Sequence, residues 1–311
     1  MTPATHWIVG PGALGRLIAL RLAGRVPVRL VGRRPLPDRQ TLVTPEGDAR
    51  VQAVVMARID ALPADPPAVV HLTTKAHGAE AAHAALAARL PAGVPLVLWQ
   101  NGFACQPRLT EHHHGPVLCA TTTEGAHVQD DDRVTHAGHG DTYIGALDGS
   151  HADLATALAQ TLTAAGLPAE AVADIRVRLW RKLAVNAAIN PLVARFAIRN
   201  GQLRDRPFRP MVERLITEVA AILAAEGVTP PGDGGLEGWR QLVWQVVEAT
   251  ASNRASMLQD VMAGRLTEHE AILVPLLDAA ARHRLTAPCL ARHLHDLRLR
   301  AAALAEPPAA C

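Results

Sequence analysis

Three polar side chains at helical spacing interrupt an apolar stretch between Trp180 and Leu192. Lys182, Asn186 and Asn190 fall one turn apart on one helix face, whereas alanine, valine, leucine and isoleucine occupy the other directions. A helix that is apolar nearly all round is buried, and burying an ammonium and two amides without partners costs several kcal/mol. The row therefore predicts a polar cleft or a bound ligand, with a solvated lysine near a helix start as the alternative.

Lysine is almost absent from the chain, which makes the charge in this row unusual. Among 31 lysines and arginines, only Lys75 and Lys182 are lysines. Arginine cannot release a proton near neutral pH, whereas a partly desolvated lysine can, and its compact head fits where a planar guanidinium does not. Lys182 is therefore a candidate for proton transfer.

A second polar cluster lies between Asn253 and Glu270. Thr267 followed by acidic residues predicts a helix start, with Thr267 as the N-cap and Glu268 in the first turn, where the helix dipole favours negative charge. Helix capping alone could account for Glu268. Asn253 and Ser256 lie one turn apart and are expected to form either a hydrogen-bonding pair or a capping pair.

The elements that must position these residues begin with a glycine motif. A strand over His6–Val9 leads into GPGALG, and a helical period follows over Leu14–Leu22. This order is typical of G-x-G-x-x-G dinucleotide sites, where glycines permit a tight turn and the approach of a pyrophosphate to a helix N-terminus. A chance turn is the alternative. The predicted cofactor-binding residues of this loop are Gly10, Gly12, Ala13, Leu14 and Gly15.

The end of the next strand, Val26–Val31, indicates which dinucleotide binds. An NAD site has Asp or Glu there for the ribose hydroxyls, but this chain has Gly32-Arg33-Arg34. An arginine pairs well with a 2′-phosphate, so the sequence predicts NADPH, held by Arg33 or by Arg34. A solvated loop charge is the other explanation.

Two further polar residues follow predicted buried strands. Lys75 comes just after a strand over Val69–Leu72, and Asn101 follows a strand over Leu96–Trp99. Open α/β sheets bind ligands at the carboxyl ends of their strands, so both side chains are candidate site residues. For Asn101 an ordinary Asn-Gly turn is the alternative.

Strand patterns end near residue 175, and only helical patterns follow. The first part is therefore predicted to be an α/β Rossmann-type dinucleotide-binding domain, residues 1–174, and the second an all-α domain for substrate binding and dimerisation, residues 175–311. The first domain should also hold a hairpin of Thr41–Thr44 with Val51–Met56, strands at Val117–Thr123, within Ala126–Gly145 and around Ala169–Ile175, and helices from after Lys75 to about Leu90 and over His151–Ala165. The second should hold helices over Arg178–Val193, Met211–Ala225, Leu236–Thr250, Glu268–Ala281 and Leu290–Leu304.

Composition argues against several other classes of protein. A net charge of +2 and 3% aromatic residues favour no nucleic-acid partner, and no stretch is long and apolar enough for a membrane span. The N-terminus has no signal-peptide pattern, and four cysteines without ligand-like spacing are typical of reduced thiols in the cytoplasm. No metal is expected, because His112 to His114 look like a solvated loop and His136 and His139 have no carboxylate or cysteine at ligand spacing.

These motifs together resemble the ketopantoate reductases along essentially the whole chain. The segments that carry the resemblance are GPGALG, TTKA, QNG, WRKLAVNAAINPL, RNGQL and SMLQD followed by GRLTE, in this order. The resemblance implies a monomer or homodimer that reduces a small 2-oxo acid, 2-dehydropantoate, to pantoate with NADPH in the pathway to coenzyme A. The alternatives are a paralogous NADPH-dependent reductase of another 2-oxo acid or ketone, and a non-catalytic NADPH-binding sensor.

Matching positions of the family motifs imply individual roles. Lys182 is the general acid that protonates the ketone oxygen as hydride arrives, and partial burial together with Lys75 should lower its pKa. Glu268 acts with it near the substrate hydroxyl, and Lys75 and Asn101 lie near the nicotinamide ribose and the reaction centre. The substrate-binding set is Asn101, Asn186, Asn190, Asn253 and Ser256, with Asn253 and Ser256 near the carboxylate and with Asn190 and Asn200 on the inter-domain face.

One departure from the family pattern follows Glu268. Many members have Ile-Asp after Thr-Glu, whereas this chain has His269-Glu270. The charge beside Glu268 therefore differs, which bears on the choice of substrate.

Overall fold

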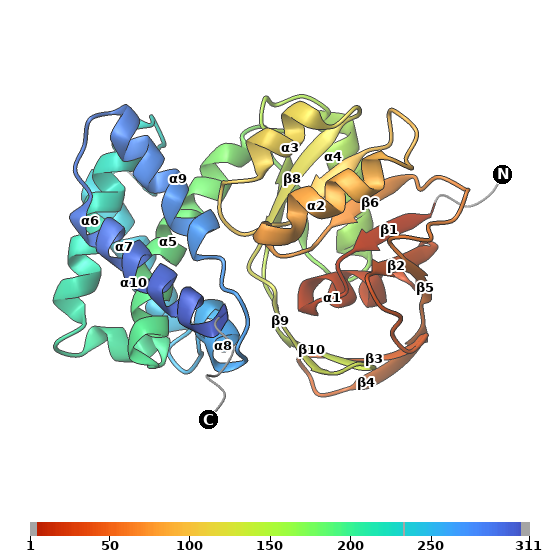
Figure 1. The fold of residues 1–311 in the computed structure, drawn as a ribbon, viewed down its shortest axis with the longest axis horizontal. Coiled ribbons are helices and arrows are strands. Elements are labelled where there is room, and N and C mark those ends of the chain that lie inside the picture. The colour runs from red at the N-terminus through yellow and green to blue at the C-terminus, as the bar shows by residue number, and fades with distance from the viewer. Residues whose placement is uncertain (1–4, 233, 306–311) are drawn as a thin grey trace. The chain divides into compact units, whose positions relative to one another are not determined.

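The computed structural model describes residues 5–232 and 234–305. The chain forms two compact units, one made of Met1–Gln100 with Cys105–Arg178 and the other of Asn101–Ala104 with Leu179–Cys311 (Figure 1). The chain therefore passes between the units three times. The short segment 101–104 belongs to the second unit, although it is flanked on both sides by the first.

The first unit is built on an eight-stranded sheet in the order β12-β11-β8-β7-β6-β1-β2-β5, parallel except for the β8–β11 pair. β1 pairs with β2 on one side and with β6 on the other, so its end is the switch point at which such sheets bind ligands. The strands are β1 (His6–Val9), β2 (Val28–Gly32), β5 (Val55–Arg58), β6 (Val69–Leu72), β7 (Leu96–Leu98), β8 (Val117–Thr122), β11 (Thr142–Gly145) and β12 (Ala169–Ala171). The helices are α1 (Ala13–Leu22), α2 (Ala76–Ala87), α3 (Gln106–His112) and α4 (Ala152–Ala164).

Three buried side-chain rings on the strands of this sheet, or directly after them, are hydrogen-bonded to one another. His6 on β1 and His71 on β6 are 9% and 0% exposed, and Trp99 follows β7. The indole Nε1 of Trp99 donates to His71 Nδ1 over 3.2 Å, so the proton of His71 sits on Nε2, which donates to His6 Nδ1 over 3.1 Å. Burial lowers the pKa of His6 to about 4 and that of His71 well below its ordinary value, so both rings are neutral at pH 7.

A second sheet of four strands follows the order β4-β3-β10-β9. Its strands are β3 (Arg39–Val43), β4 (Ala49–Ala53), β9 (Gly125–Asp130) and β10 (Arg133–Gly138). α1 contacts both sheets, and its Arg16, which is 1% exposed, donates to Gln40 Oε1 and to the carbonyls of Asp130 and Asp131. The predicted hairpin is confirmed as β3 with β4, but Val55 and Met56 lie in β5, which pairs with β2 in the first sheet.

The second unit is all-helical apart from segment 101–104. It contains most of α5 (Ile175–Phe196), the 3-10 helix η1 (Asn200–Arg204), α6 (Arg209–Ala225), α7 (Gly235–Ala249), α8 (Ser256–Met262), α9 (His269–Arg282) and α10 (Pro288–Ala305). All five predicted helices are confirmed, and α8 and η1 were not predicted. The predicted strand Ala169–Ile175 is too long, because β12 ends at Ala171 and α5 begins at Ile175.

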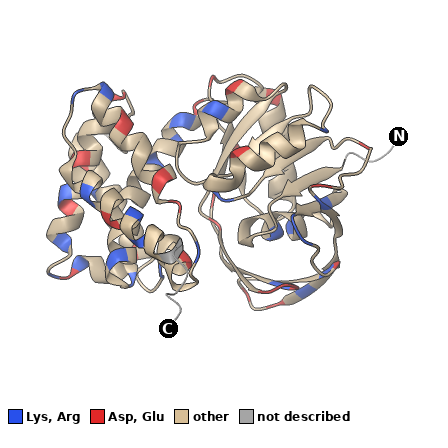
Figure 2. Ribbon diagram, viewed as in Figure 1, with Lys and Arg blue, Asp and Glu red and all other residues tan. Residues whose placement is uncertain are grey.

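The predicted fold class is confirmed by this order of elements. Acidic and basic residues are interspersed along both units (Figure 2). Within the described ranges, no helix has the length and apolar character that crossing a membrane requires.

Candidate active site

The polar row predicted on α5 lies on a buried helix. Lys182 and Asn186 are half-buried, and Asn190 is 5% exposed. Between and around them, Leu183, Ala184, Ala187, Ala188 and Ile189 belong to the apolar core of the helical unit. The sequence pattern thus correctly indicated a helix that is apolar nearly all round and carries one polar face.

Two opposing effects set the proton affinity of Lys182. Burial lowers its pKa from the ordinary 10.5 to about 8, and the negative charge of Glu268 raises it. An ammonium with a pKa near 8 is charged at neutral pH and still able to give its proton to an oxygen that gains negative charge. The effect of burial is as expected from the sequence, and the effect of Lys75 stays a prediction.

Glu268 is held at the start of α9 with its carboxylate turned towards Asn101. It is 6% exposed, and its Oε2 accepts a hydrogen bond of 3.1 Å from Asn101 Nδ2. The prediction that Thr267 is the N-cap is wrong: Glu268 occupies that position and makes no side-chain capping bond, and Thr267 Oγ1 bonds to His269 Nδ1 over 2.7 Å. Glu268 is therefore not explained by helix capping, because its carboxylate is used in a tertiary contact.

Segment 101–104 owes its position to close packing on α9 and α5. At Gly102, where φ is +85°, a Cβ would lie 2.0 Å from the carbonyl oxygen of Ala271, so only glycine fits. The Phe103 amide donates to that same carbonyl over 3.2 Å, and the Phe103 ring lies 5.0 Å from that of Trp180. These contacts bring Asn101 to Glu268. The alternative of an Asn-Gly hairpin turn is wrong, since β7 is followed by α3.

The loop before α8 carries Asn253 and is held by η1. The backbone N–H of Asn200 donates to the backbone carbonyl of Asn253 over 3.0 Å, and the side-chain Nδ2 of Asn200 donates to Thr250 Oγ1 over 2.9 Å. The side chains of Asn253 and Ser256 are exposed. Neither predicted pairing is seen among the described residues, because Ala255 is the N-cap of α8 and no hydrogen bond joins Asn253 to Ser256.

The glycine loop of the first unit has the geometry that a pyrophosphate requires. A Cβ at Gly10 would lie 2.6 Å from the Thr74 nitrogen, and one at Gly15 would lie 2.1 Å from the Gly10 oxygen. Gly12 is exposed at the N-terminus of α1, and a Cβ there would meet nothing within 4 Å. Since Ala13 and Leu14 open the helix, their amides belong to the first turn, where anions bind. The loop therefore fits a dinucleotide.

Of the two arginines after β2, one is engaged elsewhere. Arg34 forms a bidentate pair with Asp131, at 2.5 and 2.7 Å. Arg33 is exposed and makes no hydrogen bond or ion pair among the described residues. Arg33 is thus the better placed of the two for a 2′-phosphate. Lys75 is exposed at the N-cap of α2, directly after the Thr73 and Thr74 that follow β6.

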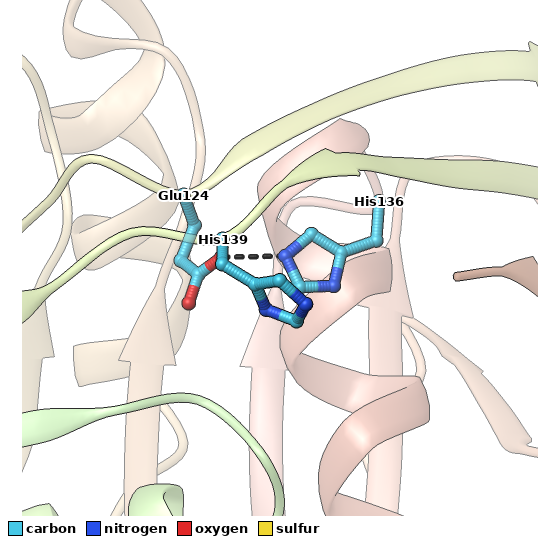
Figure 3. Close-up of side chains that lie close together, drawn as sticks. All are labelled: Glu124, His136 and His139. Atoms are coloured by element: carbon cyan, nitrogen blue, oxygen red, sulfur yellow. Dashed lines mark hydrogen bonds and ion pairs between the residues drawn. The ribbon is translucent and has the colours of Figure 1, made fainter. Parts of the chain in front are cut away.

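Sequence spacing missed a carboxylate beside His136 of β10 and His139, which follows that strand. Glu124, His136 and His139 have ligand atoms within 4.8 Å of one another, and His136 Nε2 lies 2.5 Å from Glu124 Oε2 (Figure 3). Arg21 donates to His136 Nδ1 over 2.6 Å, so Nε2 carries the ring proton and donates a hydrogen bond to Glu124 Oε2. Both ring nitrogens of His136 are occupied in a buried Arg-His-Glu row, which leaves no lone pair for an ion.

The three adjacent histidines are not simply a solvated loop. His112 ends α3, and His113 bonds through Nε2 to the Val94 carbonyl, 2.8 Å away, and through Nδ1 to His83, 3.1 Å away. The ring of His113 therefore joins α2, α3 and the turn before β7.

Known proteins resemble this chain along most of its length. Residues 7–149 match the family model of ketopantoate reductase PanE/ApbA, and residues 174–300 match the model of its C-terminal part. The chain belongs to the ketopantoate reductase family. Within this family it is 34% identical over 286 residues to the 2-dehydropantoate 2-reductase of Vibrio cholerae, covering 90% of this chain and 92% of that one.

Relatives from distant organisms and solved structures extend the likeness. The 2-dehydropantoate 2-reductase of Archaeoglobus fulgidus is 35% identical over 268 residues, covering 85% and 87% of the two chains. A family member from Ralstonia eutropha has the same fold, with a TM-score of 0.86 at 22% identity over 97% of this chain and all of that one. D-mandelate dehydrogenase also shares the fold, with a TM-score of 0.85 at 18% identity over 96% and 99% of the two chains.

Proposed function

We propose that this protein reduces 2-dehydropantoate to pantoate with NADPH, which converts a 2-oxo acid to a 2-hydroxy acid on the route to coenzyme A. The observation that carries the proposal is the pair of Lys182 and Glu268, a half-buried ammonium and a buried carboxylate that act on each other. Membership of the ketopantoate reductase family supports the reaction class and the substrate.

The first unit would hold the cofactor. Gly10, Gly12, Ala13, Leu14 and Gly15 fit a pyrophosphate, Arg33 would pair with the 2′-phosphate, and Lys75 and Asn101 would lie near the nicotinamide ribose. NADPH supplies a hydride to the carbonyl carbon when it is bound. We therefore propose that residues 1–174 bind the nucleotide and that residues 175–311 bind the substrate.

Lys182 would donate its proton to the substrate oxygen. The carbonyl oxygen gains negative charge as its carbon is reduced, and a cation within hydrogen-bond reach stabilises that charge before the proton moves. Glu268 would favour the charged form of Lys182 and accept a hydrogen bond from the substrate hydroxyl. Asn101 fixes the Glu268 carboxylate by donating to Oε2.

The remaining polar side chains would orient the substrate. The two amides on the same face of α5, Asn186 and Asn190, lie one and two turns beyond Lys182. Asn253 and Ser256, both exposed next to the start of α8, offer an amide and a hydroxyl for the carboxylate group.

We also propose a cytoplasmic monomer or homodimer. Cys105, Cys119 and Cys289 form no disulfide among the described residues, which supports a reducing compartment. A structurally similar ketopantoate reductase from Staphylococcus aureus is dimeric, with a TM-score of 0.82 at 21% identity.

The test mixes purified protein with NADPH and either 2-dehydropantoate or a panel of other 2-oxo acids. Loss of NADPH absorbance with 2-dehydropantoate, and much slower loss with the panel, is the expected result. Turnover of only another oxo acid would overturn the substrate assignment. Tight binding of NADPH without turnover of any compound would overturn the enzymatic assignment.

A further inference from the structure

Three consecutive polar residues are buried where α9 begins. Thr267, Glu268 and His269 are 9%, 6% and 3% exposed, whereas the five residues before them are exposed. Buried polar groups need hydrogen-bond partners, so the side chains on either side of Glu268 must be accounted for.

The partners form a single row that runs from α9 to α10. Glu270 Oε1 lies 3.4 Å from His269 Nε2, and Arg298 binds the Glu270 carboxylate at 2.6 and 2.7 Å. Burial lowers the pKa of His269, so the ring is neutral at pH 7. Because a carboxylate only accepts, the ring proton is on Nε2, and Nδ1 accepts the hydroxyl proton of Thr267 over 2.7 Å.

The bond between Thr267 and His269 spans Glu268. The backbone at Glu268 has φ −89° and ψ 27°, which lies outside the helical region, and α9 starts at the next residue. A side-chain bond between its two neighbours restrains this conformation. The Glu268 carboxylate accepts a hydrogen bond from Asn101, raises the pKa of Lys182 and makes no capping bond to its own helix.

We propose that His269 is a positioning residue for Glu268, which it orients through Thr267 while Glu270 and Arg298 anchor its ring. The inference rests on the proposed function, because Glu268 and Lys182 are the catalytic pair there. The charged groups that act on His269 are Glu270 and Arg298, and the charged group that acts on Lys182 is Glu268. Removing the ring should therefore weaken the action of Glu268 on Lys182.

Because the chain has only two lysines, the titration of Lys182 can be measured directly. With lysine carrying 13C at Cε, the full chain gives two lysine signals in NMR spectra, and Lys75→Arg assigns them. In the wild-type protein the Lys182 signal should titrate near pH 8. In His269→Leu it should titrate at lower pH, towards the value in Glu268→Gln, because the neighbouring carboxylate is no longer held in place. Lys75 should titrate unchanged.

Two further variants separate positioning from stability. His269→Asn retains a side-chain oxygen that can accept the Thr267 hydroxyl and should restore the wild-type titration. His293→Leu removes another buried imidazole, 8% exposed on α10 of the same unit, and should leave the Lys182 titration in place. Circular dichroism confirms that each variant is folded.

Kinetics with 2-dehydropantoate should follow the titration. We expect kcat of His269→Leu to fall roughly tenfold, with the KM for NADPH changed less than about twofold, because misplacing a catalytic group affects the transition state most. An unchanged Lys182 titration in His269→Leu, or the same shift in His293→Leu, would overturn the inference. Since the titration needs no turnover, an inactive wild-type protein would count against the proposed function alone.

Discussion

Each unit contains a buried polar cluster, and the histidine row of the first unit differs in charge from the Lys182-Glu268 pair of the second. In the sheet of the first unit, His6, His71 and Trp99 donate and accept along one row, and burial keeps both imidazoles neutral. In the helical unit, Lys182 is also desolvated, yet the charge of Glu268 counteracts the loss of its proton. Burial of a polar group therefore does not identify a site by itself.

The histidine row and the Lys182-Glu268 pair differ in the groups that surround the buried side chains. Neutral rings bonded to one another connect β1, β6 and the residue that follows β7, and they have no charge to offer a reactant. An ammonium kept charged by a nearby carboxylate can stabilise negative charge on a substrate oxygen. The Arg21-His136-Glu124 row of the first unit does contain charged groups, but both ring nitrogens of His136 are occupied by the protein itself.

Replacing the charged group should have the largest effect. Lys182→Ala should lower kcat at least ~100-fold, because the proton donor is lost, while NADPH affinity changes little. Steady-state kinetics and cofactor titration measure both quantities. His6→Gln, a change in the neutral row, should leave kcat within about twofold. If Lys182→Ala kept the wild-type kcat, the distinction between the two regions would have no catalytic meaning.

Lowering the pH should lower the free energy of unfolding through the neutral histidine row. The pKa of His6 is about 4 in the folded chain and 6.5 when unfolded, so between these values the unfolded chain binds more protons and stability falls as pH falls. We expect His6 to account for a loss of about 3 kcal/mol in the free energy of unfolding from pH 7 to pH 4.

Urea denaturation of the wild-type protein and of His6→Gln at several pH values checks this. The gap between the two free energies of unfolding should narrow by about that amount on acidification, since the variant has no imidazole at this position. Parallel curves would mean that His6 has the same pKa in the folded and the unfolded chain.

The smallest effect concerns exposed charges with and without a partner. Arg33→Ala should weaken NADPH binding roughly tenfold and NADH binding much less, because a charge-assisted bond to the 2′-phosphate is lost. Arg34→Ala is the matched control: its guanidinium is paired with Asp131, so NADPH binding should change less than about threefold. Equal losses of affinity for NADPH and NADH in Arg33→Ala would mean that another residue binds the 2′-phosphate.

Local patterns predicted most of the elements but not their partners. β1 and β6 were predicted to the residue, because each is a short buried run followed by turn residues. α3 and α8 have seven residues each, which is too short for a helical period to stand out. Val55 and Met56 were assigned to the wrong sheet, since an alternating pattern does not specify the neighbouring strand.

The site was predictable where it follows one helix and not where it depends on distant contacts. The face of α5 that carries Lys182 follows from spacing alone. The orientation of Glu268 depends on Asn101, which lies 167 residues away in the chain, so a local rule gave the wrong N-cap. The contact between Glu124 and His136 was not predicted, because strand pairing, and not sequence spacing, brings the two residues together.

Segment 101–104 limits how the protein can be divided or recombined. A fragment that starts at residue 179 would lack Asn101 and the Gly102 and Phe103 contacts with Ala271 and Trp180, and so would omit part of its own packing. A chimera that takes its nucleotide-binding half from a relative would import a foreign version of this segment. Designers of such hybrids must therefore transplant these four residues together with the helices.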